Sequence, residues 1–127
     1  QSYRNLMQQM EPNLQELAVL MAEKILRKEI IQEPEMIIRV VKEVLKENKA
    51  GDVYYIYVHP SDNSILMDSI QELKAVVPYG AAIHIVPDKR ITPGGCRLET
   101  EIAYYDATLD GQLRELRKLL QGGGSDA

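Results

Sequence analysis

The sequence predicts an α/β fold in which amphipathic helices and a small mixed sheet share one core. Apolar side chains recur at helical spacing in residues 14–26 and 37–45, which is typical of helices with one apolar face. Residues 53–58 and 82–86 are short β-branched and aromatic runs, and residues 96–105 alternate with a period of two, as strands do. Because neither kind of element is stable with its apolar face in water, we expect them to pack together.

The chain is expected to open with a pair of amphipathic helices. Pro34 suits the first turn of the second helix, and the segment 48–51 ends that helix. The first helix should carry one apolar face, and that face must be covered to be stable. Its members are Leu14, Leu17, Ala18, Met21, Ala22, Ile25 and Leu26.

A strand, a crossover helix and a second strand are expected next. The strand at 53–58 ends before Pro60, and Ser61 is placed to cap a helix that stops before Pro78. The apolar run at 82–86 predicts the second strand.

The carboxyl-terminal part begins with a Pro-Gly-Gly turn at 93–95. The alternation that follows predicts a long strand or a hairpin, and Thr108 or Asp106 then caps a leucine-spaced helix. The predicted order is α-α-β-α-β-β-α, with a small mixed three-stranded sheet. The predicted buried side of the alternating segment comprises Cys96, Leu98, Thr100, Ile102 and Tyr104.

Length and composition limit the function classes. With 127 residues the chain is expected to form a single domain over 1–121, and the glycine-rich end 122–127 is expected to be a flexible tail. The formal net charge of −4 argues against a nucleic-acid partner, which requires a basic face. No apolar run is long enough for a membrane span, and one cysteine excludes an internal disulfide, so a soluble cytoplasmic protein is expected.

Cys96 raises the hypothesis of a small thiol enzyme. A nearby imidazole, from His84 or His59, would favour a reactive thiolate. The alternative is that Cys96 is a small buried apolar residue, and its place on the same strand side as Leu98 favours this interpretation.

Glu99 and Glu101 lie two apart on one strand face, as an acid and a base would. The same spacing fits a solvated sheet face, which the alternation already requires. The two histidines and their neighbouring aspartates show no recognised metal-ligand spacing. We therefore expect no catalytic residues, no metal and no cofactor, and a chain that is not an enzyme.

Aromatic residues mark a candidate partner surface. Tyr55 and Tyr57 share one side of the strand at 53–58, and Tyr105 is expected to join them on the polar sheet face. Tyrosine is enriched in protein interfaces, although the amino-terminal helices would remove this surface if they covered it. The leucine stripe of the last helix fits a core position better than a docking groove.

Five short segments carry a resemblance to a known family. They are Ala22–Leu26, His59–Asp62, Pro87–Asp88, Gly94–Thr100 and Asp106–Thr108. In this order and spacing the chain resembles the carboxyl-terminal domain of FliH, the flagellar export protein, and its virulence-secretion relatives of the HrpE/YscL type. These proteins are stator-like regulators of a secretion ATPase.

The resemblance implies a non-catalytic adaptor that binds and negatively regulates the ATPase of a flagellar or type III export apparatus. The implied partners are the amino-terminal region of a FliI-like ATPase and a second copy, joined through the helical amino-terminal region. The implied location is the cytoplasmic side of the inner membrane, peripheral to the export apparatus and without membrane insertion.

An amphipathic partner helix is expected to lie on apolar surface between sheet and helices. The predicted contacts are Tyr55, Tyr57, Leu113 and Leu116. Two other functions stay open, an E-type peripheral-stalk subunit of a rotary V/A-type ATPase and, more remotely, the small thiol enzyme.

Overall fold

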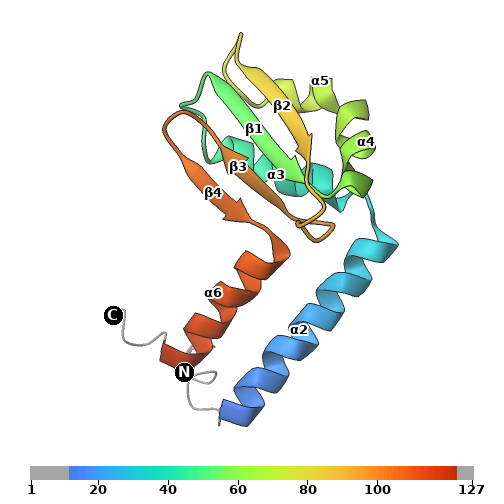
Figure 1. The fold of residues 1–127 in the computed structure, drawn as a ribbon, viewed down its shortest axis with the longest axis vertical. Helices are drawn as coiled ribbons and strands as arrows, with labels where there is room; N and C mark the ends of the chain where they lie inside the picture. Colours follow the sequence, from blue (N-terminus) through green and yellow to red (C-terminus); the bar gives the residue numbers. More distant parts are fainter. Residues whose placement is uncertain (1–11, 123–127) are drawn as a thin grey trace.

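The computed structural model describes residues 12–122, so the predicted tail lies outside the described residues except for its first position. The fold is mixed α/β, which confirms the predicted class (Figure 1). The elements are α2 (Pro12–Gln32), α3 (Met36–Lys46), β1 (Val53–Val58), α4 (Pro60–Asp68), α5 (Ile70–Lys74), β2 (Ala82–Pro87), β3 (Cys96–Glu99), β4 (Tyr104–Ala107) and α6 (Leu109–Gly122).

The described part of the chain forms a four-stranded sheet with the order β2-β1-β3-β4. Strands β1 and β2 are parallel and are joined by α4 and α5, as the predicted crossover requires, while the other two pairings are antiparallel. The predicted three strands are one too few, because residues 96–107 form the hairpin that the alternation left open beside one long strand. Its turn closes on Thr100, whose hydroxyl accepts the Ala103 N–H at 2.9 Å and whose N–H donates to the Ala103 carbonyl at 2.9 Å.

The hairpin changes which side chains face the core. Tyr105 pairs with buried Leu98, so it lies on the covered side of the sheet, and the prediction that it joins Tyr55 and Tyr57 is wrong. Tyr104 pairs with Glu99 instead and is exposed, as is Ile102 in the turn, against the prediction that both are buried. Period two continues only along one strand, and a turn restarts it.

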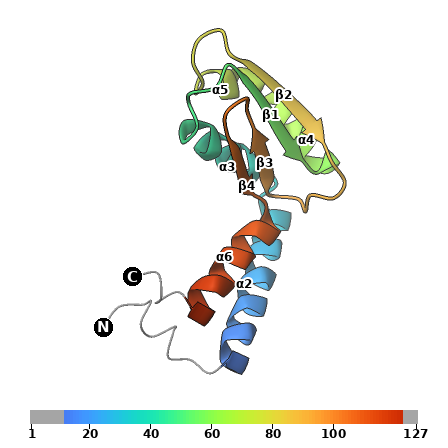
Figure 2. The ribbon, with the colours of Figure 1, turned by 60° about the vertical axis from the view of Figure 1, so that its left-hand side comes forward.

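Helices α3, α4 and α5 cover one face of the sheet (Figure 2). The core between them includes Tyr54, whose ring is fully buried and whose hydroxyl donates to the Asn48 carbonyl at 2.8 Å. That bond satisfies a polar group that would be costly to bury alone. The other main core residues are Ile37, Val41, Leu45, Ile56, Val58, Leu66, Leu73, Cys96 and Leu98.

Helices α2 and α6 pack side by side and extend away from the sheet (Figures 1 and 2). A second apolar cluster joins them, built on Val19, Leu109, Leu113 and Leu120. The prediction that the first helix buries one whole apolar face is only half right. Ala18, Ala22 and Leu26 pack on this cluster, whereas Leu14, Leu17, Met21 and Ile25 are 49–61% exposed.

The predicted turn at 93–95 is confirmed, and it ties the two clusters together. Gly94 has a φ of +93°, and a Cβ there would lie 2.5 Å from the Ile30 side chain of α2. A Cβ on Gly95 would lie 2.7 Å from the Leu109 nitrogen at the start of α6. The buried Asp62 of α4 accepts the Gly94 N–H at 2.9 Å. Only residues without a side chain allow this close approach.

The capping residue differs from the prediction at the start of α4, and at the start of α6 it is one of the two residues predicted. His59, rather than Ser61, caps α4, because its ring nitrogen accepts the Ser61 N–H at 3.0 Å. Thr108 caps α6 by accepting the Gly111 N–H at 3.0 Å. Asp106 accepts the Thr108 hydroxyl at 2.5 Å, so it orients the cap instead of serving as one.

Candidate functional site

The uncovered face of the sheet is the candidate site, and we call it the open face. Strand register brings Tyr55 of β1 between His84 of β2 and Glu99 of β3, and it brings Tyr57 beside Arg97. The alternative that the amino-terminal helices cover Tyr55 and Tyr57 is wrong for the described helices. Helix α3 lies on the opposite face of the sheet and α2 packs on α6 (Figure 2).

Ring contacts and hydrogen bonds hold both tyrosines in place. The Tyr55 ring stacks on His84 with 5.0 Å between centroids and 18° between planes. The Arg97 guanidinium lies 5.2 Å from the centre of the Tyr57 ring. The Tyr57 hydroxyl donates to Glu99 at 2.9 Å, and this bond, followed by burial and the charge of Glu99, raises the pKa of Tyr57. The aromatic surface is therefore largely pre-ordered before any partner arrives.

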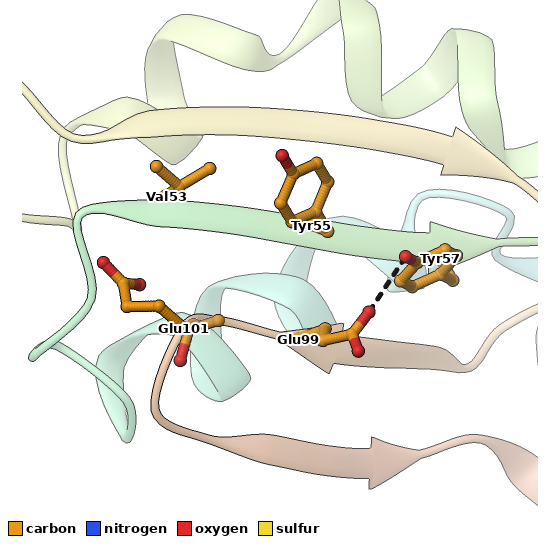
Figure 3. Close-up of a pocket in the computed structure, with 6 residues that line it drawn as sticks. Val53, Tyr55, Tyr57, Glu99 and Glu101 are labelled. Atoms are coloured by element: carbon orange, nitrogen blue, oxygen red, sulfur yellow. Dashed lines mark hydrogen bonds between the residues drawn. The ribbon is translucent and has the colours of Figure 1, made fainter.

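A shallow pocket of about 390 Å³ lies on this face (Figure 3). It is lined by Val53, Tyr55, Tyr57, Glu99, Thr100 and Glu101.

Glu101 closes the pocket at the hairpin turn. Its carboxylate accepts the Asp52 N–H, with an oxygen–nitrogen distance of 3.1 Å. Hydrogen bonds from its own backbone N–H and then from that of Asp52 lower the pKa of Glu101, so it is ionised at neutral pH.

Ion pairs fix Arg97 at the border of the open face. Asp88 contacts Arg90 at 3.0 Å and Arg97 at 3.4 Å. Hydrogen bonds from Arg90, side chain first and then backbone, lower the pKa of Asp88 to about 2. Arg97 is thus held over Tyr57 by a carboxylate that stays charged.

The other two predicted partner contacts lie elsewhere. Leu113 is 8% exposed and packs with Val19 in the cluster between α6 and α2, and Leu116 is half-buried beside it. The structure therefore separates Leu113 and Leu116 from Tyr55 and Tyr57, and their role in partner binding stays a prediction.

Helix α2 adds an apolar surface that the sequence prediction missed. Leu14, Leu17, Met21 and Ile25 are exposed along one side of the helix, and we call them the α2 stripe. Their spacing of three, then four, then four residues separates them from the side that packs on α6. That spacing is the signal that could have revealed two apolar faces.

Cys96 is buried, as predicted by the favoured alternative to the thiol-enzyme hypothesis. Cys96 is fully buried, and burial, followed by the charge of Asp106, raises the pKa of its thiol to about 12. Cys96 pairs with core residue Val58, whereas His84 pairs with Tyr55 on the open face. The Cys96–His84 pairing is therefore wrong, because the two side chains lie on opposite sides of the sheet.

Within residues 12–122, no group of three or more His, Cys, Asp or Glu side chains is arranged to hold a metal ion. In the same described range, no helix is long and apolar enough to cross a membrane.

A small α/β domain with a helix pair at one end and an uncovered aromatic sheet face has the features of a protein-interaction domain. The model of the flagellar assembly protein FliH matches residues 1–116, and the chain belongs to the FliH family. This confirms the resemblance seen in the sequence.

Two relatives illustrate the range of the family. The type 3 secretion system stator protein of Yersinia enterocolitica is 29% identical over 120 residues, which cover 94% of this chain and 51% of the relative. The probable flagellar assembly protein FliH of Bacillus subtilis is 29% identical over 105 residues, which cover 83% of this chain and 50% of the relative. The chain spans about half the length of the curated relatives it matches.

Proposed function

We propose that this chain is the ATPase-binding part of a non-catalytic stator of a flagellar or type III export apparatus. The observation that carries the proposal is the open face, an ordered aromatic surface left uncovered by the described helices. The family membership and a relative named as a stator protein support it.

The partner proposed for the open face is an amphipathic segment from the amino-terminal region of a FliI-like export ATPase. Tyr55 and Tyr57 would be its main contacts, since pre-ordered tyrosines supply contact area at a low cost in side-chain entropy. Leu113 and Leu116 would contribute by fixing α6 against α2, which positions the helix pair relative to the sheet.

A second copy of the chain is the proposed partner of the α2 stripe. Exposed apolar residues at heptad-like spacing are stabilised when a second helix covers them. Two copies joined in this way would hold one ATPase subunit, restrain its hydrolysis and keep it at the cytoplasmic side of the inner membrane, peripheral to the export apparatus.

The proposal is tested by measuring the mass of the chain, alone and mixed with the cognate export ATPase, by light scattering, together with ATP hydrolysis rates. We expect a complex of two copies of the chain per ATPase subunit and slower hydrolysis. A mixture whose components keep their separate masses and an unchanged hydrolysis rate would overturn the proposal.

A further inference from the structure

We propose that the pocket on the open face takes a basic side chain, arginine or lysine, from the partner segment. The inference deepens the proposed function and rests on it, because it specifies the chemistry of the residue that anchors the partner. Glu99 and Glu101 flank the pocket, and none of its described lining residues is a lysine or an arginine.

The negative charge of the pocket is not neutralised within the described chain. Glu99 is exposed, and only its Oε1 atom has a hydrogen bond, from Tyr57, so within residues 12–122 its Oε2 atom is available to a donor. Glu101 is ionised and is engaged by the backbone N–H of Asp52, with no ion pair among the described residues. The two carboxylates point toward opposite ends of the pocket (Figure 3). A cation beside Glu99 would gain a charge-assisted hydrogen bond to its free oxygen, and Glu101 adds negative charge at the other end.

The aromatic walls suit the same ligand. Tyr55 is 40% exposed, with one ring face used by His84, which leaves surface free toward the pocket. The neighbouring pair of Arg97 over Tyr57, at 5.2 Å, shows that this face already holds one guanidinium against a tyrosine ring. Arg97 itself is engaged by Asp88 and does not line the pocket. Cation–π attraction and carboxylate pairing therefore favour the same kind of side chain.

The shape of the pocket indicates a side chain rather than a whole ligand. A shallow hollow of about 390 Å³ gives little enclosure for a free small molecule. A long basic side chain fits, because its aliphatic stem can lie on Val53 and Tyr55 while its charged head reaches Glu99. An acidic side chain at the same place would be repelled by both glutamates.

The preference of the pocket is testable without the partner. The ¹⁵N-labelled chain would be titrated with N-acetyl-arginine amide, with the lysine equivalent and with the neutral isostere N-acetyl-citrulline amide, and followed by NMR. We expect arginine and lysine to shift the resonances of Val53, Tyr55, Glu99 and Glu101, with citrulline producing much smaller shifts. Equal shifts with citrulline, or basic-probe shifts that do not cluster at the pocket, would overturn the inference.

The second arm uses the export ATPase and conservative variants. Glu99→Gln and Glu101→Gln keep the size and the acceptor oxygen of each side chain but remove the charge, and circular dichroism would confirm that both variants fold. Each should weaken binding of the ATPase amino-terminal segment about fivefold or more, and replacing one basic residue of that segment by glutamine should cost about as much. The matched control is Glu115→Gln, an exposed glutamate on α6, which should bind as the original chain does.

The two arms separate the inference from the proposed function. ATPase binding that is unaffected by Glu99→Gln, by Glu101→Gln and by loss of every basic residue of the segment would leave the proposed function standing and overturn the inference. Absence of ATPase binding, with basic-probe shifts confined to the pocket, would overturn the proposed function and leave a pocket that takes basic side chains of another protein.

Discussion

Gly94 shows at the scale of one residue how the turn at 93–95 joins the two clusters. Its φ of +93° is a backbone conformation that side chains disfavour, and Ile30 occupies the space that a Cβ would need. Gly80 has a similar φ of +86°, but a Cβ added there would meet no atom within 4 Å. Comparing substitutions at Gly80 and Gly94 therefore separates the cost of backbone strain from the cost of a steric contact.

Substituting these two glycines by alanine should therefore give different losses of stability. Gly80→Ala should cost about 1 kcal/mol of unfolding free energy, since only the left-handed backbone is penalised. Gly94→Ala should cost about 1–3 kcal/mol more, because Ile30 must move. Urea denaturation followed by circular dichroism measures both, and equal losses would show that Gly94 does not form a close contact with α2.

Cys96 provides a residue-scale prediction with a definite pH dependence. The pKa of its thiol rises from 9.0 to about 12 in the folded chain, so the group contributes stability that is complete below pH 9.0. As the pH rises from 9.0 toward about 12, the unfolded thiol ionises while the folded one does not, and this stability is lost. This loss of stability at high pH should be absent in Cys96→Ala. In a second experiment, iodoacetamide at pH 8 should modify the folded chain far more slowly than the urea-unfolded chain. Rapid modification of the folded chain would contradict the burial.

At the scale of elements, α2 has two apolar sides with different partners. Ala18, Ala22 and Leu26 pack on α6, while the α2 stripe faces outward. The sequence predicts the helix and its apolar residues correctly because both follow from a local period. It does not predict the division between the two sides, since that depends on α6, which lies about ninety residues further along the chain.

The α2 stripe leads to an element-scale prediction. Met21→Glu should lower the mass of the chain in solution from dimer to monomer, because it places a charge in the proposed contact between copies. Thermal stability of the monomer should change little, since Met21 is exposed and contributes little to the core. The measurement is light scattering over a concentration series. The matched control is Leu119→Glu, which changes an exposed leucine of α6 and should leave the dimer intact. A dimer that persists in Met21→Glu would contradict the role of the α2 stripe.

For the strands too, a local pattern predicts the element itself but not features that depend on other segments. Alternation predicts β3 and places Cys96 and Leu98 in the core, as the structure confirms. It leaves a long strand and a hairpin both open and does not locate the turn between β3 and β4, because the bonds between Thr100 and Ala103 that close the turn have no strong sequence signal. Residues after the turn are therefore assigned to the wrong face.

At the scale of the whole molecule, two apolar clusters meet at one glycine turn, and the open face lies on the sheet beyond them. The sequence predicts that Tyr55 and Tyr57 share a face, since they lie two apart on one strand. Their neighbours His84, Arg97 and Glu99 could not be predicted, because strand order and register are set by packing between distant segments. The sequence therefore predicted the two tyrosines of the candidate site but not the residues that surround them.

Tyr55 and Tyr105 provide a matched pair for testing whether the open face binds the export ATPase. They are 40% and 41% exposed and lie on opposite faces of the same sheet. A photo-crosslinking residue, p-benzoylphenylalanine, would be placed at either position and the chain irradiated in complex with the ATPase. We expect efficient crosslinking to the amino-terminal region of the ATPase from position 55 and little from position 105. A complex that forms but crosslinks from position 105 and not from position 55 would contradict the assignment of the open face as the docking surface.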